Sequence, residues 1–160
     1  MASWWDEQVT PAGDKPASPQ WDDLRQQAMN LLEQEARLQQ IVRLVGADSL
    51  PDRQRWVLDA ARLLEEGFLQ QNALHAIDAY AVPAKQLRLL RLLWNFAQGR
   101  GLVAIGVPLL HLREKLDTPR LLRLKESVPN DNVDEIDHVR KELQTRLRAL
   151  ADEYRQRRQP

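Results

Sequence analysis

Apolar side chains in the first third of the chain recur at the spacing of a helix. Between residues 22 and 45 they return every three or four positions, which places them on one face of an α-helix. That face comprises Leu24, Ala28, Leu31, Leu38, Val42 and Val45. Asp22 and Asp23 fall in the expected first turn, where the helix dipole favours negative charge, and Gly46 is a typical residue to end a helix. The pattern therefore predicts a helix over residues 22–45.

The next segment, residues 46–55, predicts a corner between two helices. It reads GADSLPDRQR, in which Ser49 and Asp52 have the spacing of a capping box and Pro51 suits a first helical turn. The helix that begins here is expected to extend to about Glu66, before Gly67 interrupts it. Its apolar face comprises Val57, Ala60, Ala61 and Leu64.

The middle of the chain predicts a deeply buried helix. Residues 68–82 have no clear period, but Pro83 opens a helix that is expected to end near Gln98. This helix is apolar on most sides, with Arg88 and Arg91 together on one side, which is typical of a helix surrounded by others.

The last third predicts short helices followed by a long one. Three glycines break the chain after residue 98, and short helices are expected at 108–116 and 119–127. A final helix over 133–157 is expected to be capped by Asn130-Asp131-Asn132. Its apolar seam comprises Ile136, Leu143, Leu147, Leu150 and Tyr154.

These elements together predict an all-α fold, a helical bundle over residues 22–158. No segment alternates apolar and polar residues in the manner of a strand. Residues 1–21 are rich in proline and contain Trp4, Trp5 and Trp21, so they predict a strap or a linker from a preceding domain that docks on an apolar surface.

Composition agrees with a folded domain and adds an uneven distribution of charge. A chain of 160 residues with 43% hydrophobic residues can bury a core, and its net charge of zero gives no overall attraction to nucleic acid or membrane. Residues 1–84 hold 7 basic and 13 acidic side chains, whereas residues 85–126 hold 9 basic and 3 acidic ones. This contrast indicates intramolecular pairing, two partner surfaces, or simply solvated helix faces.

The motifs of common catalytic sites are missing from the sequence. It has no cysteine, no G-x-x-x-x-G-K-[ST] phosphate loop, no G-x-S-x-G elbow and no H-E-x-x-H pair. Its three histidines are too far apart for ligand spacing, and no apolar run approaches the ~20 residues of a membrane span. We therefore expect no enzyme activity of the chain alone, no metal or cofactor in it, no nucleic-acid partner and no direct membrane insertion.

Three motifs follow one another in an order that resembles a known family. They are IVRLVGADSLP at 41–51, FLQQNA at 68–73 and IDAY at 77–80, and Pro83, Lys85 and Gln86 follow in register. Together with Trp4-Trp5 and the Gly106-Val107-Pro108 turn, they resemble the C-terminal helical domain of the catalytic A (alpha) subunit of V/A-type rotary ATPases and ATP synthases.

The resemblance implies a mechanical function. In this family the domain couples the opening and closing of the nucleotide site to rotation of the central stalk, without catalysis on its own. Its partners are the central-stalk subunits and the neighbouring A and B subunits, in a cytoplasmic head peripheral to the membrane. ATP or ADP with Mg²⁺ is held by the nucleotide-binding domain of the parent subunit, whose catalytic motifs are not in these 160 residues.

The resemblance also implies two sites. The corner that would contact the stalk comprises Asp48, Ser49, Leu50, Pro51, Asp52 and Arg53, and its mixed charge predicts a steric contact rather than a charge match. Phe68 and Leu74 occupy the adenine-pocket side, where the family has two aromatics, so Leu74 predicts weaker packing on the base. Further departures are Ala81 in place of the family's cysteine and Gly99-Arg100-Gly101 within a helix that the family tends to continue.

Two other functions are compatible with the residues. One is a freestanding helical adaptor, or a degenerate A-subunit-like protein, that binds a non-ATPase partner through its proline-rich segment and the basic stretch 85–126. The other is a helix-turn-helix nucleic-acid binder, which net neutrality and the apolar 87–97 stretch disfavour. It would depend on Arg88, Arg91, Arg113, Arg120, Arg123 and Lys125.

Overall fold

The computed structural model of the chain describes residues 18–70, 74, 76–78 and 81–157, and the regular elements among them are all helical. This confirms the prediction of an all-α fold. The elements are α2 (Ser18–Val45), the 3-10 turn η1 (Ala47–Ser49), α3 (Asp52–Leu64), the π turn η2 (Glu65–Leu69), α4 (Pro83–Ala97), α5 (Arg100–Ala104), α6 (Leu109–Lys115), α7 (Thr118–Ser127) and α8 (Asp134–Gln156).

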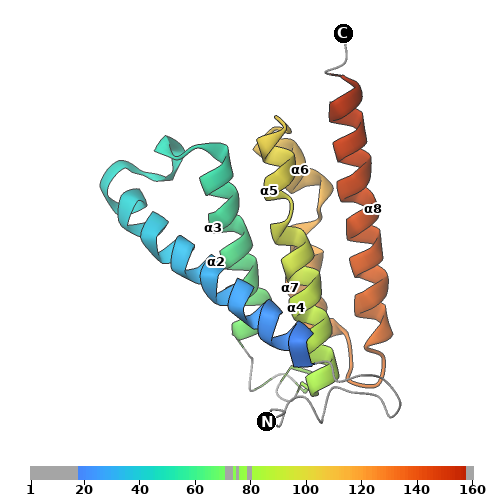
Figure 1. Cartoon of the computed structure of the whole chain (residues 1–160). Coiled ribbons are helices and arrows are strands. Elements are labelled where there is room, and N and C mark those ends of the chain that lie inside the picture. Colours follow the sequence, from blue (N-terminus) through green and yellow to red (C-terminus); the bar gives the residue numbers. More distant parts are fainter. Residues whose placement is uncertain (1–17, 71–73, 75, 79–80, 158–160) are drawn as a thin grey trace.

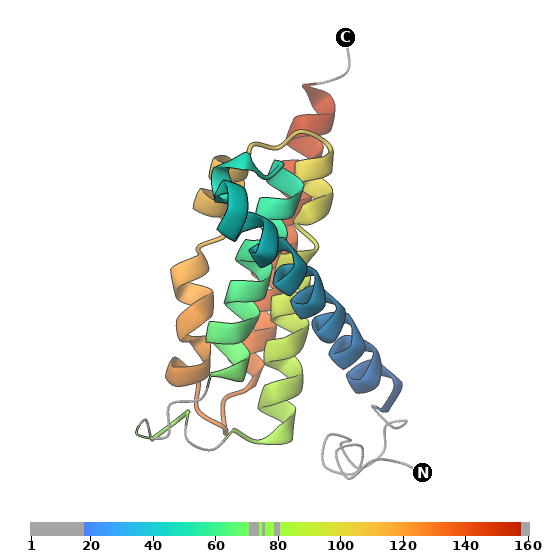
Figure 2. The same ribbon diagram turned by 90° about the vertical axis from the view of Figure 1, so that its left-hand side faces the viewer.

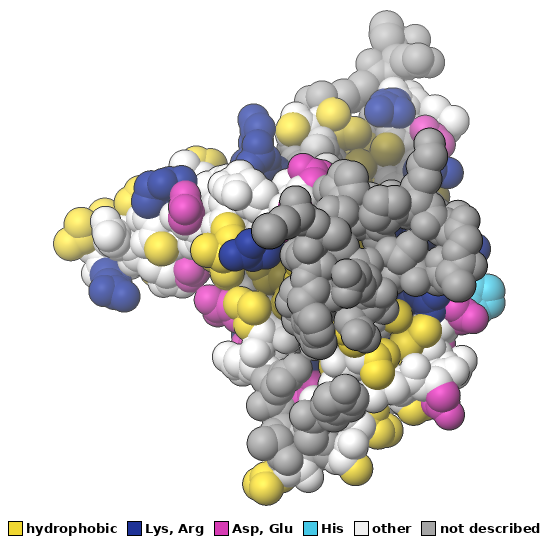
Figure 3. Space-filling model, turned by 60° about the horizontal axis from the view of Figure 1, so that its bottom comes forward, with side chains coloured by type: hydrophobic (Ala, Val, Ile, Leu, Met, Phe, Trp, Pro, Cys, Tyr) yellow, Lys and Arg dark blue, Asp and Glu magenta, His cyan; other side chains and the backbone are white. Residues whose placement is uncertain are grey.

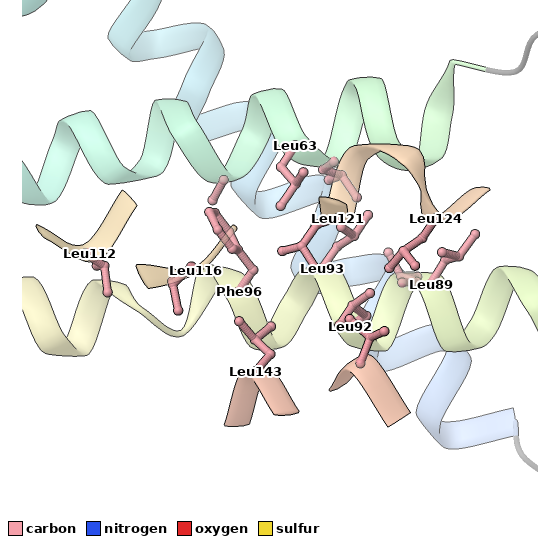
Figure 4. Close-up of a cluster of buried hydrophobic side chains, with 14 of the residues drawn as sticks. Leu63, Leu89, Leu92, Leu93, Phe96, Leu112, Leu116, Leu121, Leu124 and Leu143 are labelled. Atoms are coloured by element: carbon pink, nitrogen blue, oxygen red, sulfur yellow. The ribbon is translucent and has the colours of Figure 1, made fainter. Parts of the chain in front are cut away.

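Helix α4 is the centre of the bundle and packs against α8, α3, α2 and α7 (Figure 1). Its leucines reach the core from several sides, as the prediction of a deeply buried helix requires. In Figure 4 they meet leucines of α3, α7 and α8 around Phe96. Each fully buried leucine contributes about 1.5–3 kcal/mol of transfer free energy, so this cluster dominates the stability of the fold.

Helix α2 crosses the other helices at an angle, and its far end leaves the bundle (Figures 1 and 2). Near that end a small cluster of Leu38, Leu50 and Val57 holds α2 to α3. Val45 lies beyond this cluster and is 58% exposed, so the predicted apolar face of α2 is not buried along its whole length. Val42, three residues earlier on the same face, packs against the small cluster, and the bundle does not extend far enough to cover Val45.

The two ends of α2 differ in how well the sequence predicted them. Gly46 ends the helix as expected, with φ of 84° and its N–H bonded to the Val42 carbonyl at 2.8 Å. The helix begins at Ser18, however, four residues before the predicted start, so Asp22 and Asp23 do not lie in its first turn. Asp23 instead accepts a hydrogen bond from Gln27 Nε2 at 2.7 Å.

Both predicted side-chain caps are wrong. The Ser49 hydroxyl donates a hydrogen bond to the Val45 carbonyl at 2.8 Å, a group at the C-terminal end of α2. Pro51 occupies the N-cap position of α3, and no side chain caps this helix. Asn130 accepts the Val82 N–H at 3.2 Å, which ties it to the segment before α4 rather than to α8. The first turn of α8 has no side-chain cap at Val133. Ser49 thus bonds a local carbonyl four residues back, whereas Asn130 bonds a backbone group that tertiary structure brings near.

The predicted interruption at Gly67 is a widened turn rather than a break. The chain continues from α3 into the π turn η2, which closes when Gln70 N–H donates to the Glu65 carbonyl at 2.8 Å. Gly67 is buried, and a Cβ there would contact Leu63 and Leu93 at 3.7–3.8 Å. Turns of this kind redirect the residues that follow them and are frequent at functional sites.

The glycine break after α4 accommodates a buried tryptophan. Trp56 is 0% exposed, stacks on Phe96 with ring centroids 4.6 Å apart, and donates Nε1–H to the Ala97 carbonyl at 3.3 Å. A Cβ on Gly99 would lie 2.7 Å from Cζ2 of Trp56. The backbone can therefore approach the indole this closely only because residue 99 has no side chain.

Candidate functional site

The two sites implied by the sequence lie at opposite ends of α3. The corner residues Asp48–Arg53 lead into this helix, and Phe68 follows it in the π turn (Figure 1). Because α3 has 13 residues, the two sites are separated by about 20 Å of helix. Six side chains of α3 are buried, so the helix is held firmly in the bundle between them.

The corner is exposed but anchored. Leu50 is only 6% exposed and belongs to the small cluster, whereas the other five predicted corner residues are exposed. The carboxylates of Asp48 and Asp52 both lie 3.5 Å from guanidinium nitrogens of Arg55. Such exposed pairs stabilise the turn little, but they offset the acidic charge of the corner.

Three exposed apolar side chains flank the corner at the end of α2. Leu44 is 85% exposed, Val45 58% and Ile41 44%, and we call these three residues the tip patch. In Figure 3 the arm formed by this end of α2 and the corner projects to the left, with hydrophobic side chains at its tip. Sequence reasoning missed Ile41 and Leu44, although their i, i+3, i+4 spacing with Val45 marks a second apolar stripe on α2.

The Phe68 end places the two predicted adenine-side residues in different environments. Phe68 is half-buried and packs against the main core, whereas Leu74 is 98% exposed and Leu69 is 52% exposed. Gln71–Ala73 of the FLQQNA motif lie outside the described residues, as do Ala79 and Tyr80 of IDAY, and Trp4 and Trp5.

Three charged side chains are buried near the same end, and sequence reasoning did not single them out as a group. Lys85 is 0% exposed, Asp78 2% and Lys125 9%. Lys85 Nζ donates to the Lys125 carbonyl at 2.6 Å, Lys125 Nζ donates to the Gln70 carbonyl, and Lys125 Nζ lies 3.8 Å from Asp78 Oδ2. Burial lowers the pKa of Lys85, while the charge of Asp78 opposes this shift. The sequence held a signal for the burial of Lys85. It lies four residues before the buried Leu89 on α4, and residues at this spacing share a helix face.

Several cations of the basic stretch 85–126 form ion pairs within the molecule. Arg113 binds Asp59 through two bonds of 2.6 and 2.9 Å, and Arg120 lies 3.0 Å from Glu142. Arg88 contacts Asp134 at 2.8 Å and Asp137 at 3.2 Å. Intramolecular pairing thus occupies several of the side chains on which the nucleic-acid and adaptor hypotheses relied, and Arg113–Asp59 joins the basic stretch to the acidic part of the chain.

Two further chemical features are not found in the part of the chain that the structure describes. Its His, Asp and Glu side chains form no group of three or more that could hold a metal ion. None of its helices is both long and apolar enough to span a bilayer.

Comparison with known proteins gives a consistent family. Residues 11–100 match the family described as the C-terminal domain of V and A type ATP synthase. The chain is 36% identical over 137 residues to the V-type ATP synthase alpha chain of Halothermothrix orenii, an alignment that covers 85% of this chain and 23% of that protein. It is also 36% identical over 155 residues to the A subunit of the A-type ATP synthase of Methanopyrus kandleri, which covers 96% of this chain and 25% of that protein.

A third relative is more similar over a shorter region. The corresponding A-type ATP synthase protein of Methanococcus maripaludis is 46% identical over 106 residues, or 66% of this chain and 17% of that protein. The chain therefore spans a quarter or less of the length of these relatives. Because the family match covers more than half of its residues, the chain belongs to the family of C-terminal domains of V and A type ATP synthases.

Proposed function

We propose that this domain couples movement at a nucleotide-binding domain to a central rotating stalk, and that it does so without chemistry of its own. The observation that carries this proposal is the arrangement of α3, which has the apolar tip patch and corner at one end and Phe68 at the other. The family match suggests that the domain works within a rotary ATP synthase, and the packed bundle is rigid enough to transmit force.

Stiffness follows from how α3 is packed. Trp56, Leu63 and Leu64 on this helix are 0–3% exposed, within a core packed as densely as an organic crystal. A displacement applied at Phe68 is therefore passed to the corner as a movement of the whole body rather than lost in local deformation. On this proposal, ATP or ADP with Mg²⁺ is held by the nucleotide-binding domain of the parent subunit in the soluble head, and neighbouring A and B subunits surround the domain.

The chemistry of the tip patch indicates the kind of contact it makes. Burial of the tip patch against a partner would lower the free energy by roughly 25 cal/mol per Å² of apolar area removed from water. The nearby carboxylates of Asp48 and Asp52 already face Arg55, so little unbalanced charge remains to attract a partner. Contact with the stalk is therefore apolar and steric, and it is expected to persist in salt that screens exposed charges.

The absence of cysteine permits a direct test of this contact. Single-cysteine variants Leu44→Cys and Leu74→Cys each carry one photo-crosslinker, and each is mixed with purified central-stalk subunits from the same organism. Position 74 is the matched control, since it is equally accessible at the other end of the molecule. We expect a stalk adduct from position 44 only, with a similar yield at about 0.5 M salt, where the screening length is only a few Å.

Two outcomes would count against the proposal. Equal adducts from both positions would indicate nonspecific contact, and no stalk adduct from position 44 would remove the corner from the mechanism. If position 44 gave no stalk adduct here but captured a protein outside the ATP synthase when the same variant was irradiated in a cell extract, the adaptor hypothesis would replace the mechanical one.

A further inference from the structure

The buried charged side chains of the described residues all gather beside the π turn that carries Phe68. They are Asp78, Lys85 and Lys125, and they come from three separate parts of the chain. Burying an ammonium group is costly unless acceptors and a counter-charge surround it. Their positions therefore require a reason beyond ordinary surface charge.

Their contacts form a path that ends on the π turn. Lys85 Nζ, from the first turn of α4, donates to the Lys125 carbonyl at 2.6 Å and so fixes the last turn of α7. Lys125 Nζ donates to the Gln70 carbonyl and has Asp78 Oδ2 as its counter-charge at 3.8 Å. Gln70 is also the residue whose N–H closes the π turn on the Glu65 carbonyl. Lys125 therefore bonds the carbonyl of a residue whose own N–H makes a π-type hydrogen bond.

The alternative to the π turn is an α turn over the same residues. In that register Leu69 N–H would bond the Glu65 carbonyl, and Gln70 would be displaced around the helix axis by up to about 100°, the rotation per residue of an α-helix. Its carbonyl would then leave Lys125, and a buried ammonium would lose its acceptor. Because π turns are rare in helices, this one calls for a stabilising contact, and the bond from the Lys125 ammonium to the Gln70 carbonyl supplies one.

We propose that Lys125 is a positioning residue that, with Asp78 and Lys85, holds residues 65–70 in the π register and so fixes the direction of Phe68. The register is a property of this chain and can be measured without any partner. Only the purpose of Phe68 depends on the proposed function.

The test compares Lys125→Met with Arg123→Met by NMR on the full chain. Arg123 is the matched control, because it lies exposed on the same helix and bonds only the Pro119 carbonyl of its own turn. Scalar coupling across the hydrogen bond between the nitrogen of residue 70 and the carbonyl carbon of residue 65 reports the π register directly. We expect this coupling in the unmodified chain and in Arg123→Met. In Lys125→Met we expect it to be replaced by coupling between residues 69 and 65.

Amide exchange separates positioning from general stability. In Lys125→Met the Gln70 amide is expected to exchange at least about tenfold faster, while buried amides of α8 change less than about twofold. A uniform acceleration across all helices would show a merely structural lysine and would overturn the inference. Retention of the coupling between 70 and 65 in a folded Lys125→Met would overturn it as well.

A measurement on the unmodified chain covers the case in which Lys125→Met fails to fold. The ammonium of Lys125 should show coupling between its Nζ and the carbonyl carbon of Gln70, together with slow proton exchange. Absence of both would overturn the inference. Crosslinking from position 44 does not depend on this register, so failure here and failure of the proposed function remain distinguishable.

Discussion

At the scale of single residues, Gly99 lies closer to Trp56 than a side chain at this position would allow. Because a methyl group at residue 99 would meet Cζ2 of Trp56 at 2.7 Å, Gly99→Ala must displace the indole from its stack on Phe96. We expect a loss of about 1–3 kcal/mol in the free energy of unfolding, measured by urea denaturation. Gly101→Ala is the matched control. A Cβ there meets nothing within 4 Å, and the variant is expected to gain about 0.4–1 kcal/mol. Equal effects at the two positions would contradict the packing argument.

Asp117 is the one described non-glycine residue with a positive φ. Its φ of 46° and ψ of 53° are left-handed, at the residue before α7, and its carbonyl accepts the N–H of Arg120 at 3.0 Å. Left-handed conformation costs an L-residue roughly 1–2 kcal/mol, and aspartate less than most. Asp117→Gly is therefore expected to raise the melting temperature, whereas Asp117→Ala, which keeps the Cβ, is not. A gain for alanine equal to that for glycine would show that backbone strain is not the cause.

Lys85 makes stability depend on pH with a definite sign. Burial lowers its pKa in the folded state below the value of about 10.4 for an unfolded lysine. Between these two pH values the unfolded chain holds more protons, so the contribution of Lys85 to the free energy of unfolding rises with pH. Relative to Lys85→Met, the unmodified chain should gain stability as pH rises toward about 10. Urea denaturation of both proteins at several pH values checks this, and a constant or falling difference would contradict it.

At the scale of elements, exposure separates two leucines that look alike in sequence. Leu44 on the tip patch is 85% exposed, and Leu143 on α8 is 3% exposed against the core (Figure 4). Leu44→Gln is expected to change the free energy of unfolding by less than about 0.5 kcal/mol. Leu143→Ala is expected to cost about 2–5 kcal/mol. Thermal denaturation of both variants measures the difference, and a large loss for Leu44→Gln would mean that the tip patch is part of the core.

The elements also show what the sequence could and could not predict. The sequence predicted α4, α6, α7 and α8 to within a residue or two at each end. Local signals were enough for two of them, namely Pro83 at the start of α4 and the apolar seam of α8. The predicted caps are wrong because Ser49 bonds the end of the preceding helix instead of the start of the next one, and because Asn130 bonds a segment that packing brings near. Gly67 signalled an interruption of the helix but not its π geometry, because the contact that we propose to hold it comes from a lysine 55 residues from Gln70 in the sequence.

At the scale of the whole molecule, the candidate site consists of two separate regions at opposite ends of α3, the corner and Phe68, rather than one pocket. Resemblance supplied the corner and Phe68 from the sequence, but the tip patch and the buried group around Lys125 became visible only when the helices were placed. The tip patch depends on α2 leaving the bundle, and the buried group depends on α4 and α7 lying side by side. Neither the departure of α2 from the bundle nor the contact between α4 and α7 can be predicted from a short stretch of sequence.

The central place of α4 has a consequence for synthesis on the ribosome. Its most extensive packing is with α8, which follows it by about 60 residues from one C-terminus to the other. At about 5–20 residues per second, the ribosome needs about 3–12 s to make that interval. During this time the nascent chain presents an uncovered leucine stripe to the cell, which is the kind of surface that chaperones bind. Translation speed through residues 98–156 thus sets how long the half-made domain is open to aggregation.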